Sequence, residues 1–151
     1  MITIRQPVES DLPILYEQQS DPVAQKMAVF GGRDWDGFQE QWRTRILANP
    51  ANVARVIVLE DGTVAGNVLC WPHDGRRYVG YWIGREFWGR GIGSEALRLL
   101  LADVTERPIY AWVALSNRGS VRVLEKNGFA ALDPQPPPNQ TDVPEQLMEL
   151  R

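Results

Sequence analysis

The sequence is poor in the residues that build disulfides and metal sites. Its 151 residues include one cysteine, Cys70, and one histidine, His73. A single cysteine excludes an intramolecular disulfide and a thiolate zinc site, and a single histidine excludes a multi-histidine metal cage. We therefore expect no metal. Cys70 is expected to be a buried packing residue and His73 a solvated turn residue.

Long apolar runs and an excess of positive charge are also missing. No apolar run approaches the ~20 residues that a membrane helix needs. Lys and Arg total 16 against 19 Asp and Glu, a net charge of -3. Nucleic-acid binders need a basic field to capture phosphates, so this balance argues against such a partner. No signal-peptide pattern is visible. These absences predict a soluble, cytoplasmic protein without membrane or nucleic-acid partners.

The length suits one domain, so we expect a single domain over residues 1–151. Alternating apolar stretches predict strands at residues 2–5, 54–60, 63–71, 77–83, 109–113, 129–132 and 146–150. Helical spacing predicts helices that begin at residues 10–11 and 36 and others over 94–106 and 117–127. Residues 18–34 read as a broken helix or loop, and the proline-rich residues 133–139 as a connector. This order predicts an α+β domain with a mixed sheet.

Local signals suggest where the first helices begin. Ser10 and Asp11 are expected to cap the first helix, with Ile14 and Leu15 on its inner face. Asp36 and Gln39 have the spacing of a capping box and predict the start of the second.

A glycine-rich loop between a strand and a helix is the most informative segment. It consists of Trp88, Gly89, Arg90, Gly91, Ile92, Gly93 and Ser94. Glycines allow positive φ and a close approach of ligand to backbone. The first amides of the following helix lack intrahelical acceptors, so they suit a phosphate or pyrophosphate.

Two other phosphate-binding motifs fit this loop poorly. Gly91, Gly93 and Ala96 formally match the dinucleotide fingerprint. That fingerprint should open a βαβ unit whose next strand ends in an acid, but here a hairpin precedes the loop and the next strand has no acid. A Walker-type loop fails because no Gly-Lys-Ser/Thr follows.

The ordered motifs resemble the GNAT superfamily of acyl-CoA-dependent N-acyltransferases. The resemblance lies in Trp88-Gly89-Arg90-Gly91-Ile92-Gly93-Ser94-Glu95-Ala96-Leu97 and in Asn117, Ser120 and Leu124-Glu125-Lys126-Asn127-Gly128-Phe129. Trp88 replaces the family's usual Gln or Arg, as in the branch similar to ribosomal-protein N-terminal acetyltransferases. The resemblance implies a single GNAT-like domain with splayed central strands. It also implies transfer of an acetyl group from acetyl-CoA to a primary amine by direct attack in a ternary complex.

The resemblance also implies roles for particular residues. The backbone of Tyr81 and Ile83 would pair with the pantetheine amides. The amides of residues 88–94 would hold the pyrophosphate, with Arg90 adding charge. Ser120 would protonate the cofactor sulfur in place of the tyrosine that relatives carry at the position of Leu124, on the same helix face. Asn117 would hold the pantetheine arm, although it is also a natural helix cap.

Several features stay open at this stage. The general base is not identified: Glu149 and a water chain are both alternatives. Trp35 is expected to form a wall of the acceptor pocket, and Arg85 and Arg118 are further candidates for phosphate contacts. The acceptor could be a protein N-terminus, a small amine or an antibiotic, and the protein a monomer or homodimer. A non-catalytic acyl-CoA-binding regulator and a nicotinamide dehydrogenase are the competing functions.

Overall fold

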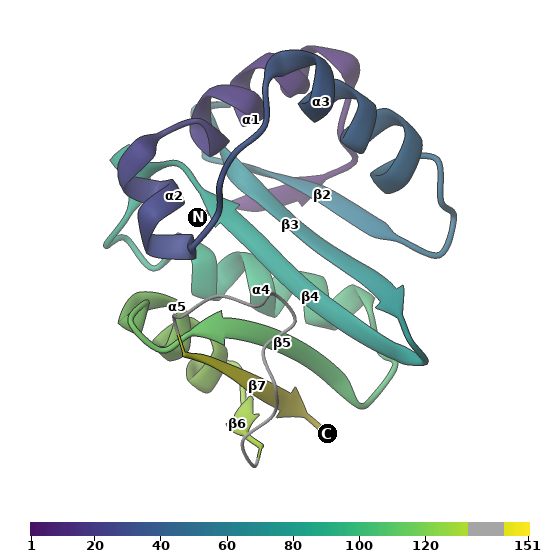
Figure 1. Ribbon diagram of the computed structural model, residues 1–151, viewed down its shortest axis with the longest axis vertical. Coiled ribbons are helices and arrows are strands. Elements are labelled where there is room, and N and C mark those ends of the chain that lie inside the picture. The colour runs from purple at the N-terminus through teal and green to yellow at the C-terminus, as the bar shows by residue number, and fades with distance from the viewer. Residues whose placement is uncertain (133–143) are drawn as a thin grey trace.

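The computed structural model describes residues 1–132 and 144–151, and within these ranges seven strands form one sheet. Their order across the sheet is β1-β2-β3-β4-β5-β7-β6 (Figure 1). The strands are β1 (Thr3–Arg5), β2 (Val53–Val58), β3 (Val64–His73), β4 (Arg76–Ile83), β5 (Ile109–Ala114), β6 (Ala130–Ala131) and β7 (Glu145–Leu150). The helices are α1 (Leu12–Gln19), α2 (Pro22–Ala28), α3 (Trp35–Glu40), α4 (Ile92–Asp103) and α5 (Arg118–Lys126). The proline-rich segment expected as a connector lies outside the described residues.

The sheet is mixed but mostly antiparallel. Only β4 and β5 are parallel neighbours, and the other adjacent pairs in the described chain are antiparallel. The expected α+β class is therefore confirmed. The strand expected at 129–132 is shorter than predicted, since only Ala130–Ala131 pairs with β7.

The central parallel strands separate along their length. They pair only at Arg77 with Ile109 and at Tyr78 with Tyr110. Beyond these two positions the carboxyl halves of β4 and β5 diverge, which opens a wedge toward α2 and α5 (Figure 1). The expected splay of the central strands is thus confirmed, and it leaves one edge of β4 without a strand partner.

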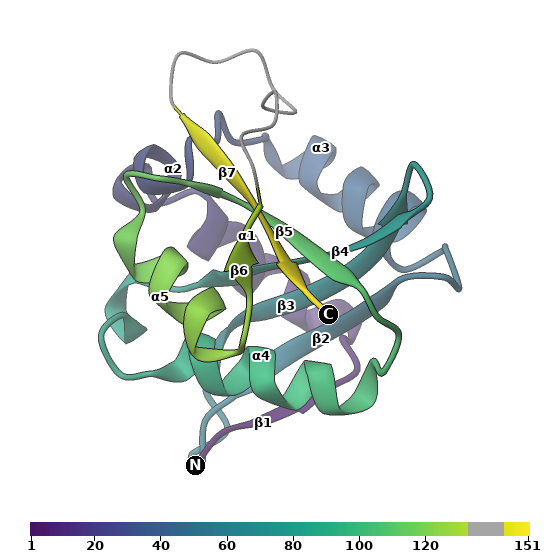
Figure 2. The ribbon, with the colours of Figure 1, turned by 90° about the horizontal axis from the view of Figure 1, so that it is seen from below.

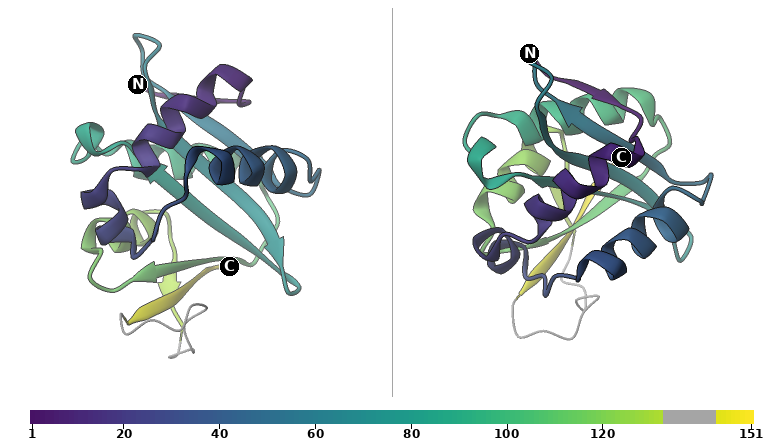
Figure 3. Two further views of the ribbon diagram at one scale, coloured as in Figure 1. Left: turned by 45° about the horizontal axis from the view of Figure 1, so that its top comes forward. Right: turned by 90° about the horizontal axis from the view of Figure 1, so that it is seen from above.

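Helices cover both faces of the sheet and define two apolar layers. α4 and α5 lie on one face (Figure 2), where Leu97, Leu100 and Leu124 pack against Val68 and Ala111. α1 and α3 cross the other face (Figure 3). There Leu12, Leu15, Phe38 and Trp42 pack against Val56. The sheet is therefore held between two helical layers, and the wedge opens between them.

α4 is amphipathic and begins earlier than its sequence pattern predicts. Its buried residues recur at helical spacing: Ile92, Ala96, Leu97, Leu100 and Leu101. It begins at Ile92 instead of Ser94 because Gly91, in the left-handed conformation, is the residue that caps it. It ends at Asp103, because Val104 is already extended, so the expected end at residue 106 is wrong.

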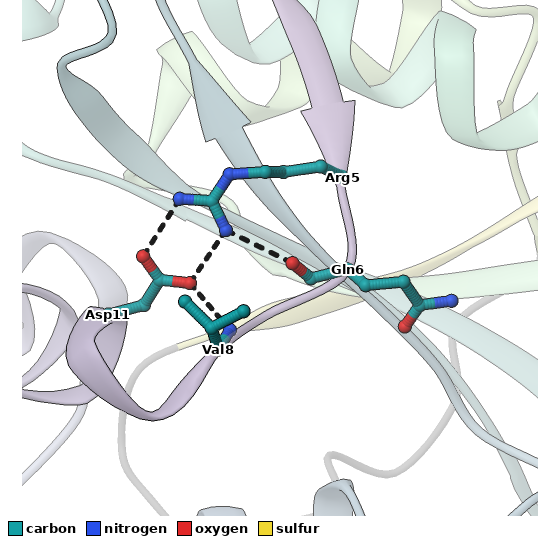
Figure 4. Close-up of polar contacts among 4 residues, drawn as sticks. All are labelled: Arg5, Gln6, Val8 and Asp11. Carbon is teal, nitrogen blue, oxygen red and sulfur yellow. Dashed lines mark hydrogen bonds and ion pairs between the residues drawn. The ribbon is translucent and has the colours of Figure 1, made fainter.

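An ion pair between the exposed Arg5 and the buried Asp11 joins β1 to the start of α1 and corrects the expected cap. Both oxygens of the Asp11 carboxylate accept hydrogen bonds from the Arg5 guanidinium, at 2.8 and 2.9 Å. Oδ2 also accepts from the Val8 amide at 2.7 Å (Figure 4). Asp11 therefore ties the preceding turn to β1 instead of capping α1 with its side chain. Leu15 faces the core as expected, but Ile14 is exposed.

The segment between the first two expected helices contains a helix of its own. α2 begins after Asp21, whose carboxylate accepts from the Val23 amide at 3.2 Å. The following helix, α3, is capped by Asp34 and not by Asp36, because the Asp34 carboxylate accepts from the Gly37 amide at 2.8 Å.

Candidate active site

The wedge between β4 and β5 contains a cavity of about 580 Å³. Four segments form its wall: the end of β4, the glycine loop with the start of α4, the start of α5, and α2. Of the residues predicted to bind the cofactor or to act in catalysis, all but Arg90 line it: Tyr81, Ile83, Trp88, Gly89, Gly91, Ile92, Gly93, Ser94, Asn117 and Ser120. Segments separated by more than 30 residues in sequence thus meet at one place.

One wall is the unpaired edge of β4. The Gly84 amide donates to the Ala65 carbonyl of β3 at 2.8 Å. Main-chain groups of alternate strand residues point to opposite neighbours, so Tyr81 and Ile83 direct theirs toward the wedge. The Trp88 indole N–H already donates to the Ile83 carbonyl at 2.9 Å. This edge can accept an extended ligand that carries amide groups.

The glycine loop forms the second wall and has the geometry of an anion cradle. Gly89 and Gly91 have φ of +79° and +75°. A Cβ added at either would meet no atom within 4 Å, so the space above the backbone is open. Gly91 caps α4 without a side-chain hydrogen bond, which leaves the first amides of a 12-residue helix available to a phosphate.

Gly93 differs from the other two glycines in its surroundings. It lies inside α4, and a Cβ there would be 3.5 Å from Val123 Cγ2 of α5. This is an ordinary van der Waals distance, so the packing of α4 against α5 leaves room for a Cβ at this position.

Of the cations that the sequence suggested, Arg118 lines the cavity, but Arg90 and Arg85 do not. The Arg90 guanidinium lies 5.7 Å from the centre of the Phe87 ring. Arg85 pairs with Asp21 at 2.9 Å. The cavity is lined instead by three cations of α5: Arg118, Arg122 and Lys126. Their spacing of four residues places them on one helix face, a signal that could have identified Arg122 and Lys126 from sequence.

Asn117 and Ser120 both line the cavity at the start of α5, but their side chains make different hydrogen bonds. Asn117 Oδ1 accepts from the Ser120 amide at 3.2 Å, so it caps the helix and keeps only its amide N–H groups for a ligand. Ser120 Oγ lies 3.0 Å from the hydroxyl of Tyr81. Leu124 is buried in the core, so the cavity neighbour of Ser120 on this helix is Val123 and not Leu124.

Tyr81 is the titratable group most perturbed in the cavity. Burial raises the pKa of its hydroxyl to about 12, although the hydrogen bond to Ser120 acts in the opposite direction. The phenol is therefore protonated throughout the neutral range. The contact between Tyr81 and Ser120 was not foreseen from sequence, because the two residues lie 39 positions apart.

Aromatic residues close the side of the cavity next to α2. The Trp82 indole N–H donates to the Gln18 carbonyl at 3.0 Å, and its ring meets Phe30 edge-on at 5.7 Å between centroids. Trp35, expected in the wall of the acceptor pocket, packs against Tyr16 and Phe38 and does not line this cavity. It belongs to the apolar layer of α1 and α3, and its role at the acceptor pocket stays a prediction.

The remaining sequence candidates lie outside the cavity. Cys70 is a buried residue of β3, and this burial raises the pKa of its thiol. His73 is exposed at the end of β3. Glu149 accepts from Arg151 at 2.7 Å, which lowers the pKa of its carboxyl together with a hydrogen bond from Tyr110.

The described residues also bear on metals and membranes. In residues 1–132 and 144–151, no three His, Cys, Asp or Glu side chains are grouped as a metal site would require. None of the helices in these ranges combines the length and apolarity of a membrane span.

Comparison with known proteins agrees with this geometry. An uncharacterized N-acetyltransferase, p20, of Bacillus licheniformis is 27% identical over 139 residues, which cover 85% of this chain and 78% of that protein. An aminoglycoside acetyltransferase solved with coenzyme A superposes with a TM-score of 0.81 at 23% identity, covering 99% of this chain and 94% of the other. Spermidine N-acetyltransferase of Vibrio cholerae, solved with coenzyme A and spermine, gives 0.81 at 18% identity over the same shares.

A match to a family model shows the family to which the chain belongs. The model described as "Acetyltransferase (GNAT) domain" matches residues 1–130, most of the chain, and this range includes the glycine loop, β4 and the start of α5. The chain therefore belongs to the GNAT acetyltransferase family.

Proposed function

We propose that the protein transfers an acetyl group from acetyl-CoA to a primary amine, which it acetylates on nitrogen. The observation that carries this proposal is the cavity, where an unpaired strand edge meets a glycine cradle at a helix N-terminus. An extended chain with amides at one end and a pyrophosphate at the other matches both walls. Acetyl-CoA has this form and supplies an acyl group activated as a thioester.

Each wall would hold a different part of that molecule. The main-chain groups of Tyr81 and Ile83 would pair with the pantetheine amides. The amides of residues 88–94 would bind the pyrophosphate. Arg118, Arg122 and Lys126 would attract the phosphate charges from α5. The Asn117 side-chain amide would donate to the pantetheine arm.

The chemistry needs no nucleophile from the protein. A primary amine attacks the thioester carbon directly, and the enzyme has to stabilise the departing sulfur. Ser120 lines the cavity beside the unpaired strand edge and would donate a hydrogen bond from its hydroxyl there. Neither Cys70 nor His73 lines the cavity, which agrees with direct attack.

The acceptor belongs to the class of primary amines. Two structurally similar proteins are an aminoglycoside acetyltransferase and a spermidine N-acetyltransferase. Trp88 is typical of the branch similar to ribosomal-protein N-terminal acetyltransferases. A protein N-terminus, a polyamine and an aminoglycoside are therefore the acceptors to test, and the net charge of -3 suits any cationic amine.

The test is an acceptor screen with acetyl-CoA, following thiol release, combined with calorimetry of acetyl-CoA binding. We expect turnover with at least one of the three amine classes. Binding without turnover on any amine would indicate a non-catalytic acyl-CoA-binding protein. The absence of binding would refute the proposal.

Two glycine variants supply the matched control. Gly91→Val should abolish acetyl-CoA binding, because the branched side chain fills the open space of the cradle. Gly75, at the β3–β4 hairpin, has nearly the same φ of +78° and equally open surroundings. Gly75→Val should therefore cost similar backbone strain but leave affinity unchanged. Undiminished affinity in folded Gly91→Val would show that the ligand lies elsewhere.

A further inference from the structure

The Tyr81 hydroxyl has one proton and two acceptors within reach, both belonging to Ser120. Its oxygen lies 3.0 Å from Ser120 Oγ and 3.2 Å from the Ser120 carbonyl oxygen. The choice between them decides where the proton of Ser120 can go. If Tyr81 donates to Oγ, the serine proton is free for another acceptor. If Tyr81 donates to the carbonyl, the Ser120 hydroxyl can donate its own hydrogen bond to the tyrosine oxygen.

The surroundings of Ser120 favour donation to Oγ. Its carbonyl lies in α5, where the amide of Leu124 is its regular helical donor. Its amide is held by Asn117 Oδ1 at 3.2 Å. The main-chain groups of Ser120 are therefore satisfied without Tyr81, and Oγ is the group that gains most from a donor.

The electrostatics keep Tyr81 in the role of donor. Burial raises the pKa of its hydroxyl to about 12, so the phenol holds its proton at the pH where the enzyme would work. A thiolate whose thiol pKa is about 8.5 is a weaker base than this phenolate, and a serine hydroxyl is less acidic still, so either hydroxyl acts on the sulfur as a hydrogen-bond donor and keeps its proton. Tyr81 is thus suited to orient a neighbouring hydroxyl and not to act as the acid itself.

We propose that Tyr81 is a positioning residue whose hydrogen bond to Ser120 Oγ directs the serine proton into the cavity, toward the sulfur of the acyl donor. This inference rests on the proposed function. Ser120 donates a hydrogen bond to the sulfur while the nitrogen–carbon bond forms and the carbon–sulfur bond breaks, and it keeps its own proton. Solvent takes the proton that the amine loses and supplies one to the departing thiolate, so protons balance.

A spectroscopic test measures this effect without turnover. Coenzyme A is bound to the wild type, Tyr81→Phe, Ser120→Ala and the double variant, and its thiol is titrated by the ultraviolet absorbance of the thiolate. A hydrogen bond to the thiolate lowers the thiol pKa. Either single change should raise that pKa by about 0.5 or more relative to the wild type, and the double change should raise it no further. Arg118, Arg122 and Lys126 also line the cavity. Because these three residues are the same in all four proteins, their charges do not explain a difference in thiol pKa between them.

Kinetics on an active amine provide the second arm. Tyr81→Phe should lower kcat about tenfold, since it removes one hydrogen bond, with little change in the KM for acetyl-CoA. Ser120→Ala should lower kcat about 10²-fold, as expected for the loss of a hydrogen-bond donor that stabilises developing negative charge, and Tyr81→Phe should add nothing to it. Ser120→Thr keeps the hydroxyl and should retain most of the activity.

The control variant removes a hydroxyl from the other face of the same strand. Tyr78 packs against Trp71 and Tyr110, away from the cavity. Tyr78→Phe should change neither the thiol pKa nor kcat. A purely structural role for Tyr81 would lower the melting temperature and the affinity for coenzyme A but leave the thiol pKa unchanged.

The outcomes separate the two proposals. An unchanged thiol pKa in Tyr81→Phe, or additive effects of the two single changes, overturns the role of Tyr81 even if the enzyme is active. If both single variants raise the thiol pKa as expected but no amine is acetylated, the positioning role of Tyr81 is upheld and the proposed function is refuted.

Discussion

Charge in the cavity comes from side chains that a motif alone does not identify. Arg90 stands in the middle of the glycine loop, yet its guanidinium stacks over Phe87 and does not line the cavity. Arg122 belongs to no recognised motif, but it lines the cavity from α5. The residue that contributes charge is therefore fixed by helix placement, not by distance along the chain from the glycines.

A pair of arginine variants tests this difference. Arg122→Ala should weaken coenzyme A binding about three- to tenfold at low salt, because it removes one charge-assisted contact, and less at high salt. Arg90→Ala should weaken it less than twofold. Isothermal calorimetry at two salt concentrations measures both effects. A larger loss for Arg90→Ala than for Arg122→Ala would restore the loop arginine as the main cation.

At the scale of elements, β1 and α1 depend on one buried carboxylate. The Arg5 guanidinium holds the pKa of Asp11 below its usual value, against the opposing effect of burial. A lowered pKa in the folded state means that the carboxylate stabilises the protein above its unfolded pKa of about 3.9. This stabilisation is lost as the pH falls through the folded pKa.

Asp11→Asn should therefore lower the free energy of unfolding by about 1–3 kcal/mol at pH 7, because it removes the charge of a buried carboxylate that accepts hydrogen bonds from Arg5 and the Val8 amide. The difference in the free energy of unfolding between Asp11→Asn and the wild type should become smaller as the pH falls below about 4. Denaturant unfolding at several pH values measures it. The exposed pair of Glu95 and Arg98 on α4 is the control, and Glu95→Gln should lower the free energy of unfolding far less than Asp11→Asn, because solvent screens exposed charges. Equal costs for both variants would contradict a special role for Asp11.

The elements that sequence predicted well are those specified by local chemistry. The glycine loop and the Asn117 cap each depend on neighbouring residues, and both lie where expected. The cap of α3 was misplaced because two aspartates stand two positions apart, and only the path of the chain chooses Asp34.

Contacts between distant elements could not be predicted in the same way. The bond from Tyr81 to Ser120 needs the register of β4 and the position of α5 together. Trp35 was assigned to the pocket from its place in a loop, but its burial against Tyr16 depends on how α1 and α3 pack. Sequence therefore identified most of the cavity lining but not the contacts between its walls.

At the scale of the whole molecule, the sheet consists of two parts joined at only two residue pairs, Arg77 with Ile109 and Tyr78 with Tyr110. A ligand that pairs with the free edge of β4 would bridge the two parts. Binding to the folded state alone should stabilise the protein by about 2.7 kcal/mol when the ligand is present at 100 times its Kd. Binding should protect some main-chain amides of β4 from hydrogen exchange more than others.

Amide hydrogen exchange on the wild type, with and without coenzyme A, tests that pattern. The amides of Tyr81 and Ile83 face the wedge and should slow by about tenfold or more on binding. The Gly84 amide is already bonded to Ala65 and serves as an internal control that should change far less. Unchanged exchange at Tyr81 and Ile83, together with a raised melting temperature, would place the ligand away from this edge.

The separation of β4 from β5 also has a consequence for self-association. A free row of amides and carbonyls is a template on which a strand of another molecule can add, so an unpaired edge is normally a hazard for solubility. Here the gap is closed at one end by the pairing of Arg77 with Ile109, and the Trp88 indole occupies the Ile83 carbonyl at the other. The stretch of β4 between these two points shares its cavity with α2 and α5. We therefore expect this edge to be less open to a strand of another molecule than the edge of an uncovered sheet.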